Sequence, residues 1–313
     1  MLTQADVRDS HFSRGVTCPR CQSTAIRWYG RDKRGNQRYR CNGCKRTFVA
    51  HTGTPMARTW YPDKWEAFAQ CMREHDSCRK VASKLRINHK TAWAWRHKVV
   101  AGLSDKTPSS IGGFVEADET YVVRSYKGSR DFKRGLMPRK PRKRGPSGGA
   151  ISRGLGKDQV AVMVMVNREA SVVSGVVDQM SKDSLLAAFG SVLEKGSVLC
   201  SDGSLSIGAF ARALAVEHHT LNLSKKERVR GVYHVQHVSS YHSRFKDWLR
   251  PFHGVSTKYL PSYVRWHQFA DADRRMVTAG ERTMLLQTIN PPTKPQEVVC
   301  PKCGTKVPVP TAP

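Results

Sequence analysis

Two aspartates in this chain are placed where carboxylates do chemistry rather than solvate a surface. Asp118 lies inside the apolar run FVEADETYVV, where an unpaired carboxylate is costly, and Asp202 directly follows the apolar run SVLCS. In a chain with formal charge +28, two acids brought together suit a divalent cation. Two such ions roughly 4 Å apart activate a nucleophile and stabilise a leaving oxygen in phosphodiester chemistry. We therefore expect Mg2+ or Mn2+ at Asp118 and Asp202.

Four cysteines near the N-terminus have the spacing of a second, different metal site. Cys18 and Cys21 form one Cys-x-x-Cys pair, and Cys41 and Cys44 form another after short strand-like runs. Four thiolates complete a tetrahedral zinc site and leave no open position, so the zinc should be structural. We expect residues 1–55 to be a zinc ribbon that needs its metal to fold. Scattered buried cysteines are the alternative.

A third cysteine pair, Cys300 and Cys303, lies in the proline-rich tail 271–313. Two thiolates cannot close a zinc site, so we expect a weak or absent site there. The start MLTQADVRDSHF has no apolar signal region, and we expect the nine cysteines in a reducing, cytoplasmic compartment.

The charge of +28 and the pI near 10.2 point to a polyanionic partner. Nucleic acid is favoured over a membrane because no apolar run approaches a spanning length. A merely solvated basic surface is the alternative.

Residues 60–104 are predicted to form one helix followed by a helix-turn-helix. The apolar spacing in YPDKWEAFAQCMREH predicts the first helix, and Asn88 is placed to cap the last. Outward basic residues of that last helix suit phosphate or base contacts. They are His89, Lys90, Arg96 and Lys98. A plain helical hairpin is the alternative, because the motif is short.

Residues 124–144 hold ten Lys or Arg and one acid, Asp131. With no apolar periodicity, this stretch predicts a mobile basic insert over 124–150 that clamps a phosphate backbone. The DNA-binding candidates within it are Arg139, Lys140, Arg142, Lys143 and Arg144. A solubilising loop is the alternative.

Residues 112–270 alternate strand and helix patterns. Valine-rich runs QVAVMVMVN and SVVSGVVD predict consecutive strands, and SKDSLLAAFGSVLEK predicts a helix capped by Ser181. The remaining elements are strand SVLCSDG, helix SIGAFARALA, strand HHTLNL and helix HVQHVSSYHSRFKDW. The predicted fold class is α/β (α+β), a mixed sheet flanked by helices with acids at strand ends.

Together these features resemble insertion-sequence transposases of the DDE type, specifically the ISXO-like group with an N-terminal zinc ribbon. The resemblance covers nearly the whole chain, and its most specific element is HVSSYHSRFKDWLRPFHGVSTKYLPSYVRW. It implies a ribonuclease-H-like catalytic domain, with Asp118 and Asp202 as the first two metal-binding acids. It also implies a bacterial, nucleoid-associated protein.

The resemblance places the third metal-site residue at position 239, where such enzymes carry Glu or, in this group, often Asn or His. Here the residue is Ser239, separated from Asp202 by 36 intervening residues. Lys246 follows seven residues later on the same helix face and is expected at substrate phosphate. A hydroxyl is a poor magnesium ligand. Three alternatives follow: Ser239 acts through water, His242 substitutes, or the chain is a decayed copy that binds DNA without cutting it.

Three further polar residues lie near these positions in the sequence. Glu116 shares the strand face of Asp118 and is either a carboxylate supporting the site or a surface acid. His234 and His237 are expected to be ordinary surface or capping histidines.

We therefore expect a DNA transposase that binds terminal inverted repeats, hydrolyses a phosphodiester at each end and joins the freed 3′-hydroxyl to target DNA. The expected partners are double-stranded DNA and further copies of the chain in a synaptic complex, with no membrane. Alternatives are a DNA-binding protein that has lost catalysis and a structure-specific nuclease of the same fold.

Overall fold

The computed structural model describes residues 4–13, 15–103, 108, 110–131, 134–136, 156, 158–222, 225, 227–275, 297–299 and 306–308. The chain divides into two compact units, Met1–Asp105 with Thr278–Pro313, and Lys106–Val277. The five basic candidates between 139 and 144, and the cysteines at 300 and 303, lie outside the described residues.

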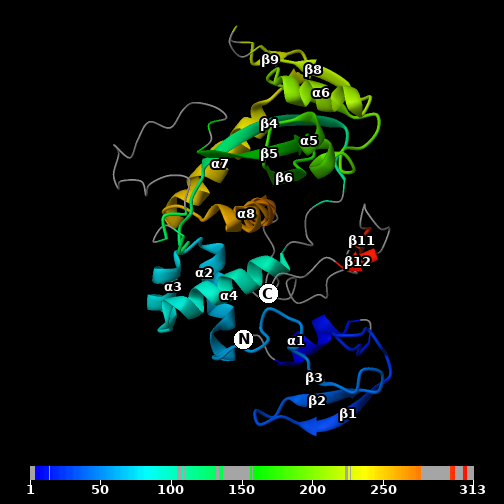
Figure 1. Cartoon of the computed structure of the whole chain (residues 1–313), viewed down its shortest axis with the longest axis vertical. Coiled ribbons are helices and arrows are strands. Elements are labelled where there is room, and N and C mark those ends of the chain that lie inside the picture. The colour runs from blue at the N-terminus through cyan, green and yellow to red at the C-terminus, as the bar shows by residue number, and fades with distance from the viewer. Residues whose placement is uncertain are drawn as a thin grey trace. The chain divides into compact units, whose positions relative to one another are not determined.

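The first unit begins with helix α1 (Gln4–His11), which the sequence patterns did not predict, and a three-stranded sheet (Figure 1). Strands β1 (Ile26–Arg31), β2 (Gln37–Cys41) and β3 (Thr47–Val49) pair antiparallel in that order. Phe12, Tyr39 and Phe48 make its small core beside the buried cysteines. A separate hairpin joins β11 (Glu297–Val299) to β12 (Lys306–Pro308).

The rest of this unit is helical. A turn η1 (Pro62–Lys64) leads into α2 (Trp65–Arg73), followed by α3 (Cys78–Leu85) and α4 (His89–Gly102). Asn88 Oδ1 accepts from Lys90 N at 2.9 Å, which confirms the predicted cap. The rings of Trp65 and Trp95 stack 4.7 Å apart and hold α2 against α4.

The second unit is built on a mixed five-stranded sheet in the order β6-β5-β4-β7-β8. These strands are β4 (Phe114–Val123), β5 (Gln159–Asn167), β6 (Val172–Val177), β7 (Val198–Ser201) and β8 (Glu217–Thr220). The first three pair antiparallel, whereas β7 runs parallel to both β4 and β8. This ribonuclease-H-like sheet confirms the predicted mixed fold class.

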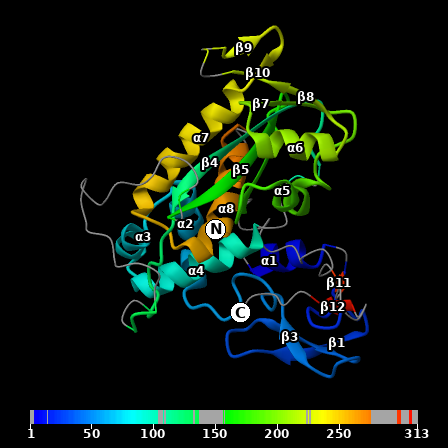
Figure 2. The same cartoon turned by 45° about the horizontal axis from the view of Figure 1, so that its top comes forward.

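Helices cover both faces of this sheet (Figures 1 and 2). Helices α5 (Lys182–Phe189) and α6 (Leu205–Ala213) pack on the apolar face. The predicted cap Ser181 is confirmed, but α5 ends at Phe189 rather than near Lys195, because the chain turns there to pair Leu193 with Ile111.

The opposite face carries α7 (Gln236–Leu249) and α8 (Leu260–Arg275), linked by the turns η4 (Arg250–Phe252) and η5 (Thr257–Tyr259). A small hairpin, β9 (Val229–Arg230) and β10 (Tyr233–His234), precedes α7 and was not predicted. Side chains alternate along β4, so Val115 and Ala117 enter the core under α5 and α6. Glu116 and Asp118 therefore face α7.

Candidate active site

Asp118 and Asp202 lie at neighbouring points of the central parallel strand pair. Strand β4 pairs with β7 up to Glu116 and Cys200, and each aspartate stands two residues beyond its member of that pair. The Asp118 side chain is 19% exposed, so it is largely removed from water without being sealed off. The two predicted acids are therefore brought together as the spacing of the strands requires.

The electrostatics at Asp118 favour a bound cation. Burial, and then the negative charges of Asp202 and Glu119, raise the pKa of Asp118 to about 7. A divalent cation would neutralise this crowding, and carboxylate oxygens are the ligands that Mg2+ and Mn2+ prefer. The residues present thus fit the metal that the sequence predicts at this position.

Helix α7 brings a histidine and a lysine to the same point. His242 Nδ1 lies 3.5 Å from Asp118 Oδ2, and the residue is 8% exposed. Among the described residues, Nε2 of this ring is buried without a hydrogen-bond partner. Burial and the charge of Lys246 lower the pKa of His242 to about 4, and Lys246 also lowers the pKa of Asp118. A neutral imidazole, able to offer a nitrogen lone pair, therefore stands beside the acid.

Ser239 is arranged differently from His242. The residue is exposed, and its hydroxyl donates to the carbonyl of Val235 on the preceding helical turn at 2.8 Å. Such a back-bond occupies the hydroxyl proton within the helix itself. Of the two candidates for the third position, His242 is thus the one in contact with Asp118.

Glu119 is an acid near Asp118 that the sequence analysis did not single out. Its neighbour Tyr121 donates a hydrogen bond to Glu119 Oε1 at 3.2 Å. Burial, and then the charge of Asp202, raise the pKa of Glu119. Strand alternation places its side chain on the opposite face of β4 from Asp118, so Glu119 acts on Asp118 through its charge.

Glu116 is not a surface acid, which corrects that expectation. It is fully buried and pairs with Arg168 at 2.8 Å. His234 and His237 are likewise more than ordinary surface histidines, since the Nδ1 atom of each lies within 3.0 Å of Glu116 Oε1. Arg168 was not singled out from the sequence, because it stands in a turn 52 residues from its partner.

The four cysteines of the first unit converge as a zinc site requires. The sulfur of Cys18 lies 3.6 Å from that of Cys44, and Cys21 and Cys41 are 3.5 Å apart. All four sulfur atoms lie within 4.8 Å of one another. Tetrahedral zinc with Zn–S bonds of about 2.3 Å places sulfurs roughly 3.8 Å apart, so the cluster fits a structural zinc ion.

Comparison with known sequences shows the family to which the chain belongs. The model of the ISXO2-like transposase domain matches residues 110–270, slightly more than half of the chain. The chain belongs to the ISXO2-like transposase family. Its N-terminus, residues 13–45, matches the InsA N-terminal domain, a zinc ribbon.

The chain is also 28% identical, over 266 residues, to an uncharacterized protein in transposable element ISH50 of Halobacterium salinarum. That alignment covers 81% of this chain and 84% of the relative. Among solved structures, the Mos1 strand transfer complex matches 70% of this chain and 79% of its own, at 14% identity and a TM-score of 0.24. A pre-cleavage Mos1 transpososome matches 69% and 81%, at 11% identity and a TM-score of 0.17. These two scores are too low to carry an argument.

The predicted DNA-binding residues of α4 divide into two groups. His89 and Lys90 are exposed at its start. Arg96 is 2% exposed and donates to the carbonyl of Asp76, and Lys98 donates to the carbonyl of Ala57 at 2.5 Å. Arg96 was wrongly placed on the outer face, because it lies one helical turn from the buried Ala92 and Val100 on the packed side of α4, whereas Lys98 is half-buried.

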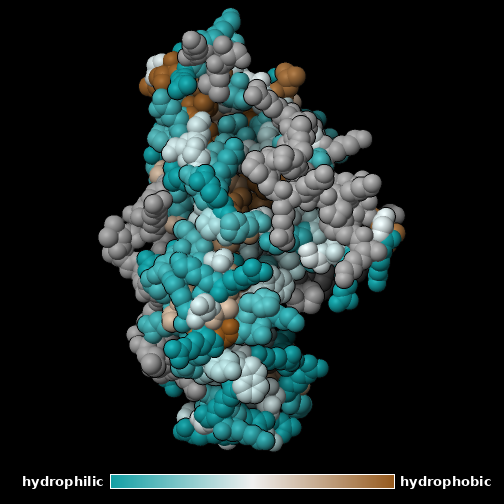
Figure 3. All heavy atoms as spheres, turned by 90° about the vertical axis from the view of Figure 1, so that its left-hand side faces the viewer, coloured by the Kyte–Doolittle hydropathy of each residue, from teal (hydrophilic) through white to brown (hydrophobic). Residues whose placement is uncertain are grey.

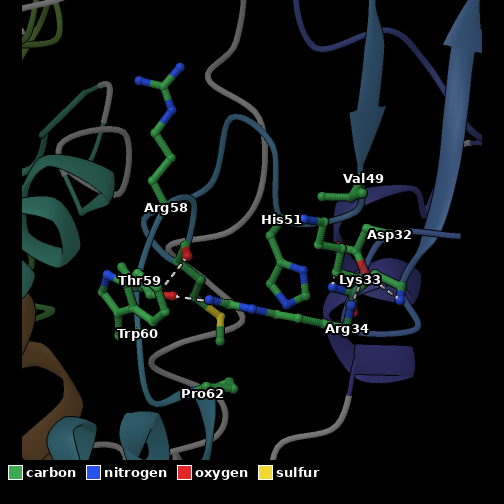
Figure 4. Close-up of a pocket in the computed structure, with 11 residues that line it drawn as sticks. Asp32, Lys33, Arg34, Val49, His51, Arg58, Thr59, Trp60 and Pro62 are labelled. Carbon is green, nitrogen blue, oxygen red and sulfur yellow. Dashed lines mark hydrogen bonds between the residues drawn. The ribbon is translucent and has the colours of Figure 1, made fainter.

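The first unit contains a cavity of about 490 Å³ that the sequence analysis did not predict (Figure 4). Arg34 extends across it, with its guanidinium 5.0 Å from the ring of Trp60 and an N–H donated to the carbonyl of Thr59 at 3.4 Å. Lys33 and His51 complete the basic lining, whereas Arg58 points away in Figure 4. The arrangement suits an anionic partner better than an apolar ligand.

The surface of the described residues is consistent with the composition of the chain. Hydrophilic residues make up most of the coloured part of the face drawn in Figure 3. Among the described residues, no helix is long and apolar enough to cross a membrane.

Proposed function

We propose that this protein is an active DNA transposase, which binds the terminal inverted repeats of its element, cleaves a phosphodiester at each end and joins the freed 3′-hydroxyl to target DNA. The observation that carries the proposal is the crowding of Asp118 by Asp202, with His242 in contact and the charge of Lys246 nearby. Structural acids are usually paired, whereas this one is held in an environment that a divalent cation would relieve.

In this proposal, Asp118 and Asp202 hold Mg2+ or Mn2+, and the neutral ring of His242 takes the third protein position. The metal would polarise the phosphate and lower the pKa of the attacking hydroxyl. Lys246 pairs with the substrate phosphate. In cleavage, water adds its oxygen to phosphorus and the bond to O3′ breaks; in joining, that O3′ attacks a target phosphorus and displaces the target's own O3′.

Binding of DNA is proposed on the charge of +28 and on exposed His89 and Lys90 of α4, with the basic insert 139–144 and the zinc ribbon as further contacts. Bringing two ends together requires at least two copies of the chain, so we propose a homo-oligomer in the synaptic complex.

One observation favours the rival function, a DNA-binding protein without catalysis: the hydroxyl of Ser239 is bonded within its own helix. A strand-joining assay on DNA carrying the element's own ends separates the two. Wild type, Asp118→Asn and Ser239→Asn are compared with Mg2+ or Mn2+. Joining by wild type but not by Asp118→Asn establishes an enzyme; a silent wild type that Ser239→Asn restores establishes a disabled one.

A further inference from the structure

Helix α7, which carries His242 and Lys246, lacks a cap of its own. Its N-cap is Val235, which has no side-chain acceptor, and there is no acid in its first turn. The first N–H groups of a helix have no partner within the helix, and leaving them buried and unsatisfied is costly. The groups that satisfy them therefore decide where this helix begins.

Those groups come from strand β4 and hairpin β9–β10 instead. Glu116 Oε2 accepts from the backbone N–H of His237 at 2.8 Å and from that of Val238 at 3.2 Å. The N–H of Gln236 lies 3.4 Å from His234 Nδ1. A buried carboxylate 121 residues away in sequence thus acts as the cap and also complements the helix dipole.

Arg168 holds the other side of Glu116 in place. Its Nη1 donates to Glu116 Oε1 at 2.8 Å, and its Nη2 donates to the carbonyl of Val232 in the β9–β10 turn at 2.8 Å. One guanidinium therefore ties the β5–β6 turn to both the strand and the hairpin that lead into α7.

The same cluster has the ligand types of a metal site, because Glu116, His234 and His237 offer atoms within 4.8 Å of one another. Arg168 Nη1 lies 3.0 Å from His234 Nδ1 and 3.3 Å from His237 Nδ1, as well as bonding Glu116. A guanidinium is always charged, so the cation of this cluster is already supplied by the chain. A metal ion there would be repelled by it.

We propose that Glu116 is a positioning residue of the active site, a role that rests on the proposed function. It stands two residues before Asp118 on the same strand face, and it fixes the first turn of α7. Through that turn it sets the distance between Asp118 and His242, which stands five residues after His237.

The test compares zinc-loaded wild type with Glu116→Gln, Glu116→Ala and a matched control, Asp271→Asn. Asp271 is a buried carboxylate that pairs α8 with Arg244 of α7 at 2.7 Å, so its loss also costs a buried ion pair. Three quantities are measured: hydrogen exchange of the amides of 237–240, Mn2+ affinity by electron paramagnetic resonance, and single-turnover strand joining.

Glu116→Ala is expected to remove exchange protection from the first turn of α7, weaken Mn2+ binding and slow joining by about 100-fold, as a misplacement near 1 Å does. Glu116→Gln, which keeps an acceptor oxygen, should recover part of each loss. Asp271→Asn should lower the melting temperature while leaving first-turn protection and Mn2+ affinity as in wild type.

Unchanged protection and Mn2+ affinity in Glu116→Ala would overturn the inference, and so would stoichiometric Zn2+ binding that needs His237 and leaves the cysteine site intact. If wild type joins no ends, the proposed function fails. The exchange and Mn2+ measurements then still decide the inference by themselves.

Discussion

Glu116 and Asp118 are two carboxylates on one face of one strand, yet their surroundings are opposite. Glu116 accepts from a guanidinium and two helix amides, whereas Asp118 faces other acids, a neutral imidazole and a lysine charge. A buried acid whose oxygens all have donors is satisfied by the fold, and removing it lowers stability. A crowded one is costly until a cation binds, which is the condition of a functional site.

The largest test of this contrast is Asp118→Asn. Strand joining should fall by at least about 10³-fold, because a catalytic metal supplies several kcal/mol at 1.36 kcal/mol per factor of ten. Affinity for end DNA, measured by gel shift without Mg2+, should stay as in wild type. Residual joining within tenfold of wild type would remove Asp118 from the metal site.

Glu116→Ala should act mainly on stability. Removing one partner of a buried ion pair costs about 3–5 kcal/mol of unfolding free energy. Here Glu116 is the buried partner, and its loss takes the carboxylate from the partly buried Arg168 and from two amides of α7. Urea unfolding of the second unit, followed at neutral pH, measures this directly. A loss no greater than that for a surface pair such as Arg250–Asp247 would contradict the comparison.

Substitutions of His242 test whether its ring binds the metal ion beside Asp118. His242→Ala should slow joining by about 10- to 100-fold, a usual cost of disturbing the groups around a metal. His242→Glu should raise activity with Mg2+ relative to Mn2+, because carboxylates suit magnesium better than imidazole does. Equal metal preference in wild type and His242→Glu would exclude the ring from metal binding.

The crowding of Asp118 should also appear in the pH dependence of stability. The pKa of Asp118 is 3.8 ordinarily and about 7 in the fold, so between these values the folded chain keeps a proton that the unfolded chain has lost. Asp118 therefore contributes a fall in the free energy of unfolding as pH rises through this window when no Mg2+ or Mn2+ is added. His242, whose pKa is lowered from 6.5 to about 4, contributes a rise between those two values. Asp118→Asn should remove the first contribution in zinc-loaded protein, so the slope of its unfolding free energy against pH should become more positive than that of wild type. An identical slope in both proteins would place its origin elsewhere.

The smallest effect is expected at Ser239. Its hydroxyl bonds the helix backbone, so Ser239→Ala should change joining by no more than about twofold, a surface-type effect of under 0.5 kcal/mol. A loss comparable to that of His242→Ala would show that the hydroxyl acts at the metal after all.

Features that depend on short stretches of the chain could be predicted from the sequence. The spacing of the four cysteines predicted the zinc ribbon, because each Cys-x-x-Cys pair of ligands lies within four residues of sequence. Asp118 was located as an acid inside an apolar run, and Asp202 as the residue that directly follows another apolar run. The seven-residue interval from Ser239 to Lys246 identified a helix face.

Other assignments depended on contacts that no local pattern encodes. Arg96 was placed outward from helical spacing alone, but the packing against Asp76 turned its face inward. Glu119 was overlooked because alternation sends it to the other side of the sheet, and the charge of Asp202 still reaches it.

The sequence by itself determined the ribbon, the mixed sheet and the positions of the two acids proposed for the metal site, since each follows from periodicity or from ligand spacing within a short stretch. Only the tertiary structure showed that His242 rather than Ser239 contacts Asp118, and that Glu116 is a buried acid rather than a surface one. The physical reason is that hydrogen-bond partners and burial are set by segments that meet across more than a hundred residues. Two carboxylates on one strand face therefore differ in role, because Glu116 meets a guanidinium and helix amides whereas Asp118 meets other acids.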